Sequence, residues 1–268
     1  MTERRVARVM TIAGSDSGGG AGIQADLKTF GAMGVFGTCA ITTITAQNTL
    51  GVTDVLETPI PLIQAQIDAI VSDIGTDAVK TGMLSSTEII EAVAERLDFH
   101  NLKVAVIDPV MVASMGAPLL REDAVDAMRD VLTRRATVLT PNTREARILT
   151  GMEVNTVEDA RAAAKMLVEE FGAQNVVVKG GHIEGPATDI LYDGSDFTTF
   201  TTERIETTNT HGTGCTLGSA IAAGLAKGLD VPTSIQQAKD YVTAAMRASY
   251  SVGQGHGPLN HFHELWAE

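Results

Sequence analysis

Short apolar runs alternate with longer segments whose apolar positions recur every three or four residues along most of the chain. The short runs are rich in β-branched residues, as buried strands are, and the longer segments have the period of helices. Strands are expected at 8–14, 38–46, 78–80, 104–107, 137–139 and 176–179, and helices at 21–33, 61–73, 86–97, 122–132, 143–150, 157–171, 216–223 and 233–250. This alternation predicts an α/β fold with a mostly parallel sheet covered by helices on both faces.

The pattern changes after residue 186. Two further apolar runs, 189–192 and 197–201, flank Asp193-Gly194 and predict an antiparallel hairpin. Segments 48–56 and 114–118 contain glycine and threonine and are expected to form flaps over a ligand. The sequence contains no repeat, low-complexity stretch or linker, so residues 1–268 are expected to form a single domain.

Composition narrows the classes of function. A hydrophobic content of 44% suffices for a large core, and the net charge of −13 argues against nucleic acid as a partner. The basic residues near the start precede no long apolar segment, so neither a signal peptide nor a membrane span is expected and the cytoplasm is the expected location. Two cysteines, Cys39 and Cys215, are too few for a disulfide framework or a four-cysteine metal site.

The polar loops follow the predicted strands. In an open parallel sheet ligands bind beyond the carboxyl ends of the strands, so these loops are expected to meet there. They are 14–22, 47–48, 81–83, 108–111, 140–145, 179–182 and 210–215. Glycines, carboxylates and a lysine together are what phosphoryl transfer requires, because the protein must position the reactants and neutralise charge with Mg²⁺.

The last of these loops is the most informative. Asn209-Thr210-His211-Gly212-Thr213-Gly214-Cys215 precedes a small-residue run that is expected to be a helix. Unpaired backbone N–H groups and the helix dipole make such a helix start an anion site, and phosphate is the natural guest. A helix start also lowers a thiol pKa, so Cys215 is a candidate general base toward a bound hydroxyl group, while nearby phosphates act in the opposite direction.

Two other nucleotide motifs are excluded. Gly20-Ala21-Gly22-Ile23-Gln24-Ala25 satisfies a relaxed dinucleotide fingerprint, but the next strand ends in Gln47-Asn48 instead of the required acid. A P-loop is absent because Gly-Lys-Ser and Gly-Lys-Thr do not occur. A NAD-dependent oxidoreductase is therefore disfavoured, and if a phosphate is bound, a loop other than these two motifs must bind it.

Several ordered motifs together resemble the hydroxymethylpyrimidine/phosphomethylpyrimidine kinases of thiamine biosynthesis, within the ribokinase-like superfamily. The resemblance rests on Asn142-x-x-Glu145, Gly212-Thr213-Gly214-Cys215, residues 13–28, Ala46-Gln47-Asn48-Thr49, Lys179-Gly180-Gly181-His182 and the tail from Gly255 to Phe262. It implies a ribokinase-like three-layer fold, a homodimer, ATP and Mg²⁺ as cofactors, and two successive phosphorylations of a small-molecule pyrimidine.

The resemblance also implies roles for individual residues. The substrate-binding candidates are Gly14, Asp26, Gln47, Met83, Val110 and Cys215. The ATP-binding candidates are Asn142, Lys179, Thr210, His211, Gly212 and Gly214. The catalytic candidates are Lys179, Gly212, Thr213, Gly214 and Cys215, and the Mg²⁺ candidates are Asp108 and Glu145. An amide such as Gln47 can pair with a ring nitrogen and the exocyclic amine of an aminopyrimidine.

Alternatives remain for the residues and for the function. Asp26 is alternatively an acid on a helix surface, and Cys215 alternatively positions the substrate without accepting its proton. A pyridoxal kinase is the nearest alternative function, because cysteine in the anion loop also occurs in pyridoxal kinases that resemble this family. A non-catalytic nucleotide-sensing module is opposed by the presence of Asn142, Glu145 and Lys179.

Overall fold

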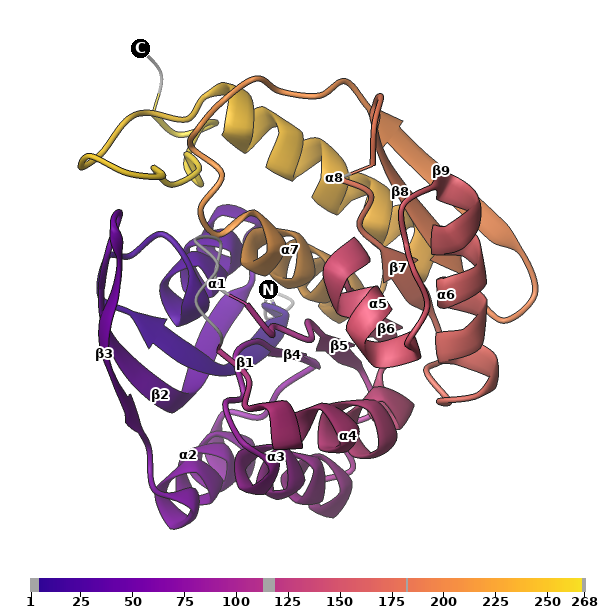
Figure 1. Ribbon diagram of the computed structural model, residues 1–268. Coiled ribbons are helices and arrows are strands. Elements are labelled where there is room, and N and C mark those ends of the chain that lie inside the picture. Colours follow the sequence, from indigo (N-terminus) through magenta and orange to yellow (C-terminus); the bar gives the residue numbers. More distant parts are fainter. Residues whose placement is uncertain (1–4, 113–118, 182, 267–268) are drawn as a thin grey trace.

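The computed structural model describes residues 5–112, 119–181 and 183–266, and a nine-stranded sheet forms its centre (Figure 1). The strands lie side by side in the order β3-β2-β1-β4-β5-β6-β7-β8-β9. Their bounds are β1 (Arg8–Asp16), β2 (Phe36–Asn48), β3 (Gly51–Glu57), β4 (Ala78–Thr81), β5 (Ala105–Ile107), β6 (Val138–Leu139), β7 (Val176–Val178), β8 (Ala187–Tyr192) and β9 (Phe197–Thr202). Strands β2 to β7 in this order are parallel, whereas β3, β8 and β9 each pair antiparallel with a neighbour, so the predicted α/β fold is confirmed.

Helices cover both faces of the sheet. Their bounds are α1 (Gly22–Ala32), α2 (Ile60–Asp73), α3 (Thr87–Phe99), α4 (Val125–Ala127), α5 (Thr143–Thr150), α6 (Val157–Glu169), α7 (Thr213–Ala226) and α8 (Val231–Arg247). Side chains of α2 to α6 pack into one apolar core, and those of α1, α7 and α8 pack into the other. Figure 1 shows α7 and α8 lying against each other on one side of the sheet. None of the helices in the described ranges has the length and apolar content needed to cross a bilayer.

Alternation along the buried strands accounts for the two cores. Val9 and Val106 point into the core beneath α1, α7 and α8, while their neighbours Met10 and Ile107 point into the core beneath α2 to α6. All four side chains are 0% exposed, and full burial of such a side chain contributes about 1.5–3 kcal/mol. A strand buried on both faces carries apolar residues at most positions, which is why its apolar run in the sequence is continuous and does not alternate with polar residues.

The order of the strands places a crevice at one edge of the sheet. After β1 the chain continues to β2 on one side, and after α2 it crosses to β4 on the other side of β1. Loops that leave β1 and its neighbours in opposite directions open a gap beyond the carboxyl ends of these strands. The polar loops of the sequence meet at this edge.

Three predicted segments differ from the observed ones. Segment 48–56, expected as a flap, largely forms β3, which pairs with β2 through a turn in which Asn48 Oδ1 accepts hydrogen bonds from Leu50 and Gly51. The helix expected at 122–132 is a succession of 3-10, α and π turns that ends at Arg135. Helix α7 begins at Thr213, three residues before the expected start. The other expected flap, 114–118, lies outside the described residues.

Candidate active site

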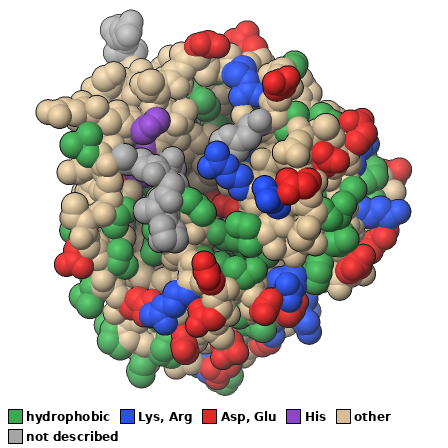
Figure 2. All heavy atoms as spheres, viewed as in Figure 1, with side chains coloured by type: hydrophobic (Ala, Val, Ile, Leu, Met, Phe, Trp, Pro, Cys, Tyr) green, Lys and Arg blue, Asp and Glu red, His purple; other side chains and the backbone are tan. Residues whose placement is uncertain are grey.

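A cavity of about 710 Å³ opens at the carboxyl edge of the sheet, and the face drawn in Figure 2 is hollowed near its centre. Its lining joins the loops after β1, β2, β4, β5, β6 and β7 to the start of α7. The candidate residues that line it are Gly14, Gln47, Met83, Asp108, Val110, Asn142, Glu145, Lys179, Thr210, His211, Gly212, Thr213, Gly214 and Cys215. The chain thus brings every candidate except Asp26 to one cavity.

The anion loop adopts the geometry of a helix start. Gly212 is the N-cap of α7 with φ of 83°, a left-handed conformation that favours glycine. A Cβ at this position would also lie 1.9 Å from the carbonyl oxygen of Gly20, so only glycine fits on both counts. Thr216 is the first residue of the helix whose N–H reaches an i−4 acceptor, which leaves the amides of Gly214 and Cys215 in the unpaired first turn. The start of α7 can therefore hold a negatively charged group.

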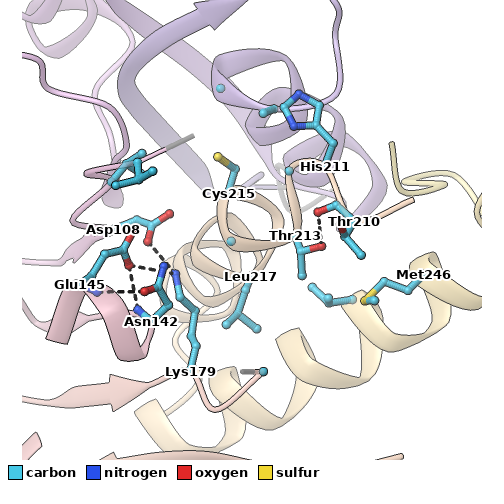
Figure 3. A pocket seen from close by; sticks show the side chains of 18 of the residues that line it. Asp108, Asn142, Glu145, Lys179, Thr210, His211, Thr213, Cys215, Leu217 and Met246 are labelled. Carbon is cyan, nitrogen blue, oxygen red and sulfur yellow. Dashed lines mark hydrogen bonds and ion pairs between the residues drawn. The ribbon is translucent and has the colours of Figure 1, made fainter. Parts of the chain in front are cut away.

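An ion-pair cluster faces the start of α7 (Figure 3). Lys179, which follows β7, places Nζ 2.9 Å from Asp108 Oδ1 and 3.9 Å from Glu145 Oε2. A Cβ on Gly214 would lie 3.3 Å from Lys179 Nζ and 3.6 Å from Asp108 Oδ2, so glycine keeps the space between helix and cluster open. One cation and two carboxylates thus surround the position next to the anion site.

Asn142 and Glu145 form a reciprocal cap on α5. Glu145 N–H donates to Asn142 Oδ1 at 2.9 Å, and Asn142 N–H donates to Glu145 Oε2 at 2.7 Å. The motif Asn142-x-x-Glu145 therefore has a structural role, because it satisfies backbone donors at the helix start. Only one of the two Glu145 oxygens is used in the cap, and the residue remains in the cavity lining.

Burial and mutual attraction set the ionisation of this cluster. Burial raises the pKa of Glu145 to about 7, and Asp108 contributes in the same direction, while Lys179 opposes it. Burial alone would lower the pKa of Lys179, but the attraction of Asp108 and Glu145 raises it overall. Lys179 is consequently a fixed positive charge at neutral pH.

The thiol of Cys215 corrects one expectation. We expected the helix start to lower its pKa, but burial raises the pKa to about 11. Lys80 is the main influence that lowers this pKa, while the carboxylates of Asp26 and Asp108 raise it together with burial and the Gly22 N–H lowers it slightly. At neutral pH Cys215 is therefore a thiol, not a thiolate base. In Figure 3 it lies between the carboxylate cluster and His211.

The position of Asp26 agrees neither with a substrate-binding residue nor with an acid on the helix surface. It is 0% exposed and does not lie on the helix surface, and it is not part of the cavity lining. Its carboxylate pairs with Lys80 Nζ at 3.0 and 3.1 Å and accepts hydrogen bonds from Thr11 at 2.6 Å and Ser219 at 2.7 Å. Lys80 is equally buried, and the attraction of the Asp26 and Asp108 carboxylates overcomes the cost of burial and raises its pKa. Asp26 thus holds a buried cation under the cavity.

The cavity is also lined by Gly14, Gln47, Met83 and Val110. The carbonyl of Met83 accepts a hydrogen bond from Thr42 Oγ1 at 2.8 Å, which fixes the loop after β4 against β2. His211, expected at ATP, has Nε2 3.3 Å from the Gln47 amide and 2.9 Å from Asp16 Oδ2. This part of the lining combines the apolar side chains of Met83 and Val110 with the amide of Gln47, which suits a small flat ring that carries polar edges.

Sequence reasoning missed several polar residues of this region. Asp16 and Thr45 line the cavity next to Gln47, and Lys80 lies beneath it. The available signals were an acid inside a glycine loop and a lysine inside an otherwise apolar strand. A second buried pair, Asp189 and Lys239 at 2.7 Å, also lines the cavity. Its partners are 50 residues apart, so no local pattern joins them.

A third part of the lining is apolar. Leu217 and Met246, from α7 and α8, lie beyond the anion site in Figure 3, and Val242 joins them in the lining. Apolar side chains next to an anion site can receive the base of a nucleotide whose phosphates lie at the helix start.

Comparison with known proteins identifies relatives over nearly the whole chain. Residues 16–260 match the family model of phosphomethylpyrimidine kinase. A hydroxymethylpyrimidine/phosphomethylpyrimidine kinase of Rhizobium meliloti is 50% identical over 262 residues, which are 97% of this chain and 98% of the relative. Bacillus subtilis pyridoxal kinase, solved as an ADP complex, has a TM-score of 0.90 and 43% identity, over 97% of this chain and 99% of that one.

A pyridoxal kinase of Staphylococcus aureus, solved with AMP-PCP and pyridoxal, has a TM-score of 0.89 and 35% identity. The match covers 97% of this chain and 96% of the solved one. The residues that match the family model, 16–260, include the glycine loop after β1, the carboxylate cluster and the start of α7. The chain belongs to the phosphomethylpyrimidine kinase family.

Proposed function

We propose that this protein transfers the γ-phosphoryl group of ATP to 4-amino-5-hydroxymethyl-2-methylpyrimidine, and then phosphorylates the monophosphate to the diphosphate, in thiamine biosynthesis. The observation that carries the proposal is that one cavity is lined by the Gln47 amide, by the start of α7 and by Lys179, which lies next to that start. The names of the relatives and the nucleotide complexes of the solved structures support it.

The residues divide the reaction between them. The amides of Gly214 and Cys215 and the ammonium of Lys179 attract the phosphates and the charge that develops on the transferred group. Thr210 and Gly212 shape this loop, since the Thr210 carbonyl accepts hydrogen bonds from Thr213 N–H and from Thr213 Oγ1. The thiol of Cys215 positions the hydroxymethyl oxygen, and a loose transition state makes little demand on a strong base.

Asp108 and Glu145 fit a magnesium ion. Mg²⁺ binds proteins through one or two carboxylates and keeps waters and phosphate oxygens as its other ligands. Asp108 Oδ2 faces the space in front of Gly214, where phosphates would lie, and Glu145 has one oxygen outside its cap. A bound Mg²⁺ would neutralise phosphate charge. Within the described ranges, no group of three or more His, Cys, Asp or Glu side chains is arranged to hold a metal ion.

Pyridoxal phosphorylation is the second candidate. The likeness to two pyridoxal kinases favours it, and a cysteine facing the cavity could contact an aldehyde. Gln47 favours the pyrimidine, because its amide matches a ring nitrogen beside an amine.

A single assay separates the candidates. Purified protein is incubated with ATP, Mg²⁺ and either the hydroxymethylpyrimidine or pyridoxal, and the products are identified by liquid chromatography and mass spectrometry. We expect pyrimidine monophosphate followed by diphosphate, at a higher kcat/KM than for pyridoxal. If neither substrate yields a phosphorylated product, the kinase function is wrong.

We further propose a cytoplasmic homodimer in which residues 1–268 form one kinase domain. Ile44 and Leu56 lie opposite each other in register on β2 and β3 and are 51% and 67% exposed. Exposed apolar pairs on an edge hairpin are favourable when a second copy covers them. Multi-angle light scattering should give twice the chain mass for the wild type and a smaller mass for Leu56→Lys.

A further inference from the structure

The Gln47 amide is enclosed by polar groups whose hydrogen-bond roles can be worked out individually. Gln47 Oε1 lies 3.1 Å from Thr45 Oγ1, and Gln47 Nε2 lies 3.3 Å from His211 Nε2. His211 Nε2 in turn lies 2.9 Å from Asp16 Oδ2. The first step is to determine which of these atoms carries a hydrogen.

Asp16 is an acceptor. Its carboxylate accepts hydrogen bonds from the backbone N–H groups of Gly18 at 2.8 Å, Gly20 at 3.1 Å and Ala21 at 2.8 Å. Burial alone would raise the pKa of Asp16, but the hydrogen bonds from His211 and from the backbone lower it overall. A carboxylate has no hydrogen to give, so the hydrogen in the contact with His211 belongs to His211 Nε2.

Thr45 provides a second, independent constraint. Its hydroxyl has a single hydrogen, and Thr45 Oγ1 donates it to the Ser15 carbonyl at 2.9 Å. Toward Gln47 the hydroxyl can therefore only accept. The group of Gln47 that faces Thr45 must therefore be a donor. His211 Nε2 has one hydrogen, which points toward Asp16, and no free lone pair, so it cannot accept from an N–H of Gln47 and favours an oxygen beside it.

Both constraints require the same orientation of the amide. Rotating the Gln47 amide by 180° exchanges its oxygen and nitrogen without moving a heavy atom position. Its nitrogen then donates to Thr45, and its oxygen lies beside the single Nε2 hydrogen of His211, which it shares with Asp16, so no contact sets two donors against each other. We infer that Asp16, His211 and Thr45 fix the orientation of the Gln47 amide, and thereby determine which donor–acceptor pattern on a ring substrate the cavity accepts.

The surroundings keep the His211 ring in place. Its backbone N–H donates to the Gly257 carbonyl at 3.1 Å, which ties it to the C-terminal tail. On the other side, a Cβ on Gly20 would lie 2.5 Å from His211 Cδ2, so the ring packs directly on the backbone of the glycine loop. These contacts place the ring against the glycine loop, with Nε2 directed at Asp16 and Gln47.

The inference rests on the proposed function and sharpens its specificity. After these contacts the Gln47 amide retains one N–H and one oxygen lone pair, which complement a ring nitrogen acceptor beside an amine donor. An analogue with a 4-oxo group in place of the 4-amino group presents the reverse pattern, a ring N–H beside a carbonyl. An amide of fixed orientation rejects this analogue, whereas an amide free to rotate accepts it.

The test compares kcat/KM for the aminopyrimidine and for its 4-oxo analogue. In His211→Phe the ring remains but its N–H is removed, and we expect the ratio of the two constants to fall at least about tenfold, mainly through KM. The KM for ATP should not change. His100→Phe is the matched control, because His100 also pairs with an aspartate, Asp68, at 2.6 Å and its side chain is 15% exposed against 13% for His211.

A second variant approaches the same amide from the other side. Thr45→Val removes the acceptor for the Gln47 N–H at nearly constant volume and should lower the ratio as well. Thr38→Val on the same strand is its control, since Thr38 Oγ1 has no hydrogen-bond partner among the described residues. If both His211→Phe and Thr45→Val keep the wild-type ratio, the inference is wrong even though the kinase function stands.

A spectroscopic measurement does not depend on activity. The ¹⁵N chemical shifts of the histidine side chains distinguish a protonated from an unprotonated Nε2, and His211 is assigned by its absence in His211→Phe. We expect Nε2 of His211 to carry the hydrogen at neutral pH, and an unprotonated Nε2 would overturn the inference. Wild-type protein that phosphorylates neither pyrimidine nor pyridoxal would instead remove the proposed function, and the specificity argument with it.

Discussion

Cys215 is held as a neutral thiol although it sits at a helix start. Burial raises its pKa to about 11, and although Lys80 lowers it, the carboxylates of Asp26 and Asp108 act in the same direction as burial. The residue that the sequence singles out most clearly therefore has a different role from the one its position suggests. The field of a helix start is a local feature, whereas burial and the carboxylates come from distant segments.

Alkylation tests the state of this thiol. In a Cys39→Ala background, the rate of Cys215 modification by iodoacetamide should be low at pH 7 and rise as the pH approaches about 11, because only the thiolate reacts. Mass spectrometry of the modified peptide gives the rate. A rate that levels off below pH 8 would mean that the thiolate is stabilised.

The two phosphorylation steps should respond differently to Cys215→Ala. The uncharged hydroxymethyl group depends on the thiol for its position, whereas the monophosphate is also held by Lys179 and the helix start. We expect the first step to slow by about 10- to 100-fold and the second step by less. Single-turnover rates with each substrate measure this, and equal losses in both steps would contradict it.

Lys179 is the fixed positive charge next to the start of α7. Lys179→Met should lower kcat/KM by about 10²–10³-fold, because the charge stabilises the transferred group. Lys165→Met serves as the control, since Lys165 forms an exposed pair with Glu169 at 3.7 Å. Steady-state assays at saturating Mg²⁺ check the difference, and a loss below threefold would exclude an electrostatic role for Lys179.

At the scale of elements, the buried pair of Asp26 and Lys80 links four of them. Asp26 lies on α1, Lys80 on β4, and the hydroxyls that donate to Asp26 come from Thr11 on β1 and Ser219 on α7. The pair therefore connects the sheet to α1 and to α7, and Cys215 lies in the first turn of α7.

Breaking this pair should be costly for folding. Asp26→Asn leaves the buried ammonium of Lys80 without its carboxylate, and Lys80→Met leaves the buried carboxylate of Asp26 without its cation. Each variant should reduce the free energy of unfolding by about 3–5 kcal/mol. The double variant should lose less than the sum of the two losses, because both charges are then absent. Urea unfolding measures all three, and additive losses would show that the two side chains do not interact.

The elements themselves were largely predictable, because buried parallel strands and amphipathic helices leave strong periodic patterns. Strand β3 was not, since its central residues are exposed and it has no buried apolar run, although it pairs with β2 along its whole length. The residues of the candidate site also fall into a predictable and an unpredictable group. Glycine loops and the cap of Asn142 and Glu145 are readable from spacing, whereas the contacts of Lys80, Asp16 and Thr45 depend on residues distant in the chain.

At the scale of the molecule, the C-terminal tail is fastened to α7 by His261. Its Nε2 lies 3.0 Å from Thr216 Oγ1, and the side chain is buried, with 3% of the residue exposed. Burial lowers the pKa of His261 to about 4, and the charges of Lys28 and His263 contribute in the same direction.

Stability should consequently fall in mild acid. The unfolded chain binds a proton at His261 near pH 6.5 and the folded chain only near pH 4, so the free energy of unfolding decreases as the pH falls between these values, by up to about 3 kcal/mol. Thermal melting from pH 7 to pH 4 measures the slope. His261→Gln lacks the imidazole, so its melting temperature should depend less on pH. An unchanged pH dependence would show that another group causes the effect.

The close approach of Gly20 and Gly212 also has a consequence for synthesis. The carbonyl of residue 20 lies against the start of α7, and the backbone N–H of His211 donates to the Gly257 carbonyl, so segments far apart in the sequence meet beside the cavity. A growing chain that stops before Gly257 has every residue that lines the cavity but lacks the carbonyl that holds His211. On the ribosome, the surroundings of Gln47 are thus completed only after residue 257 has been added.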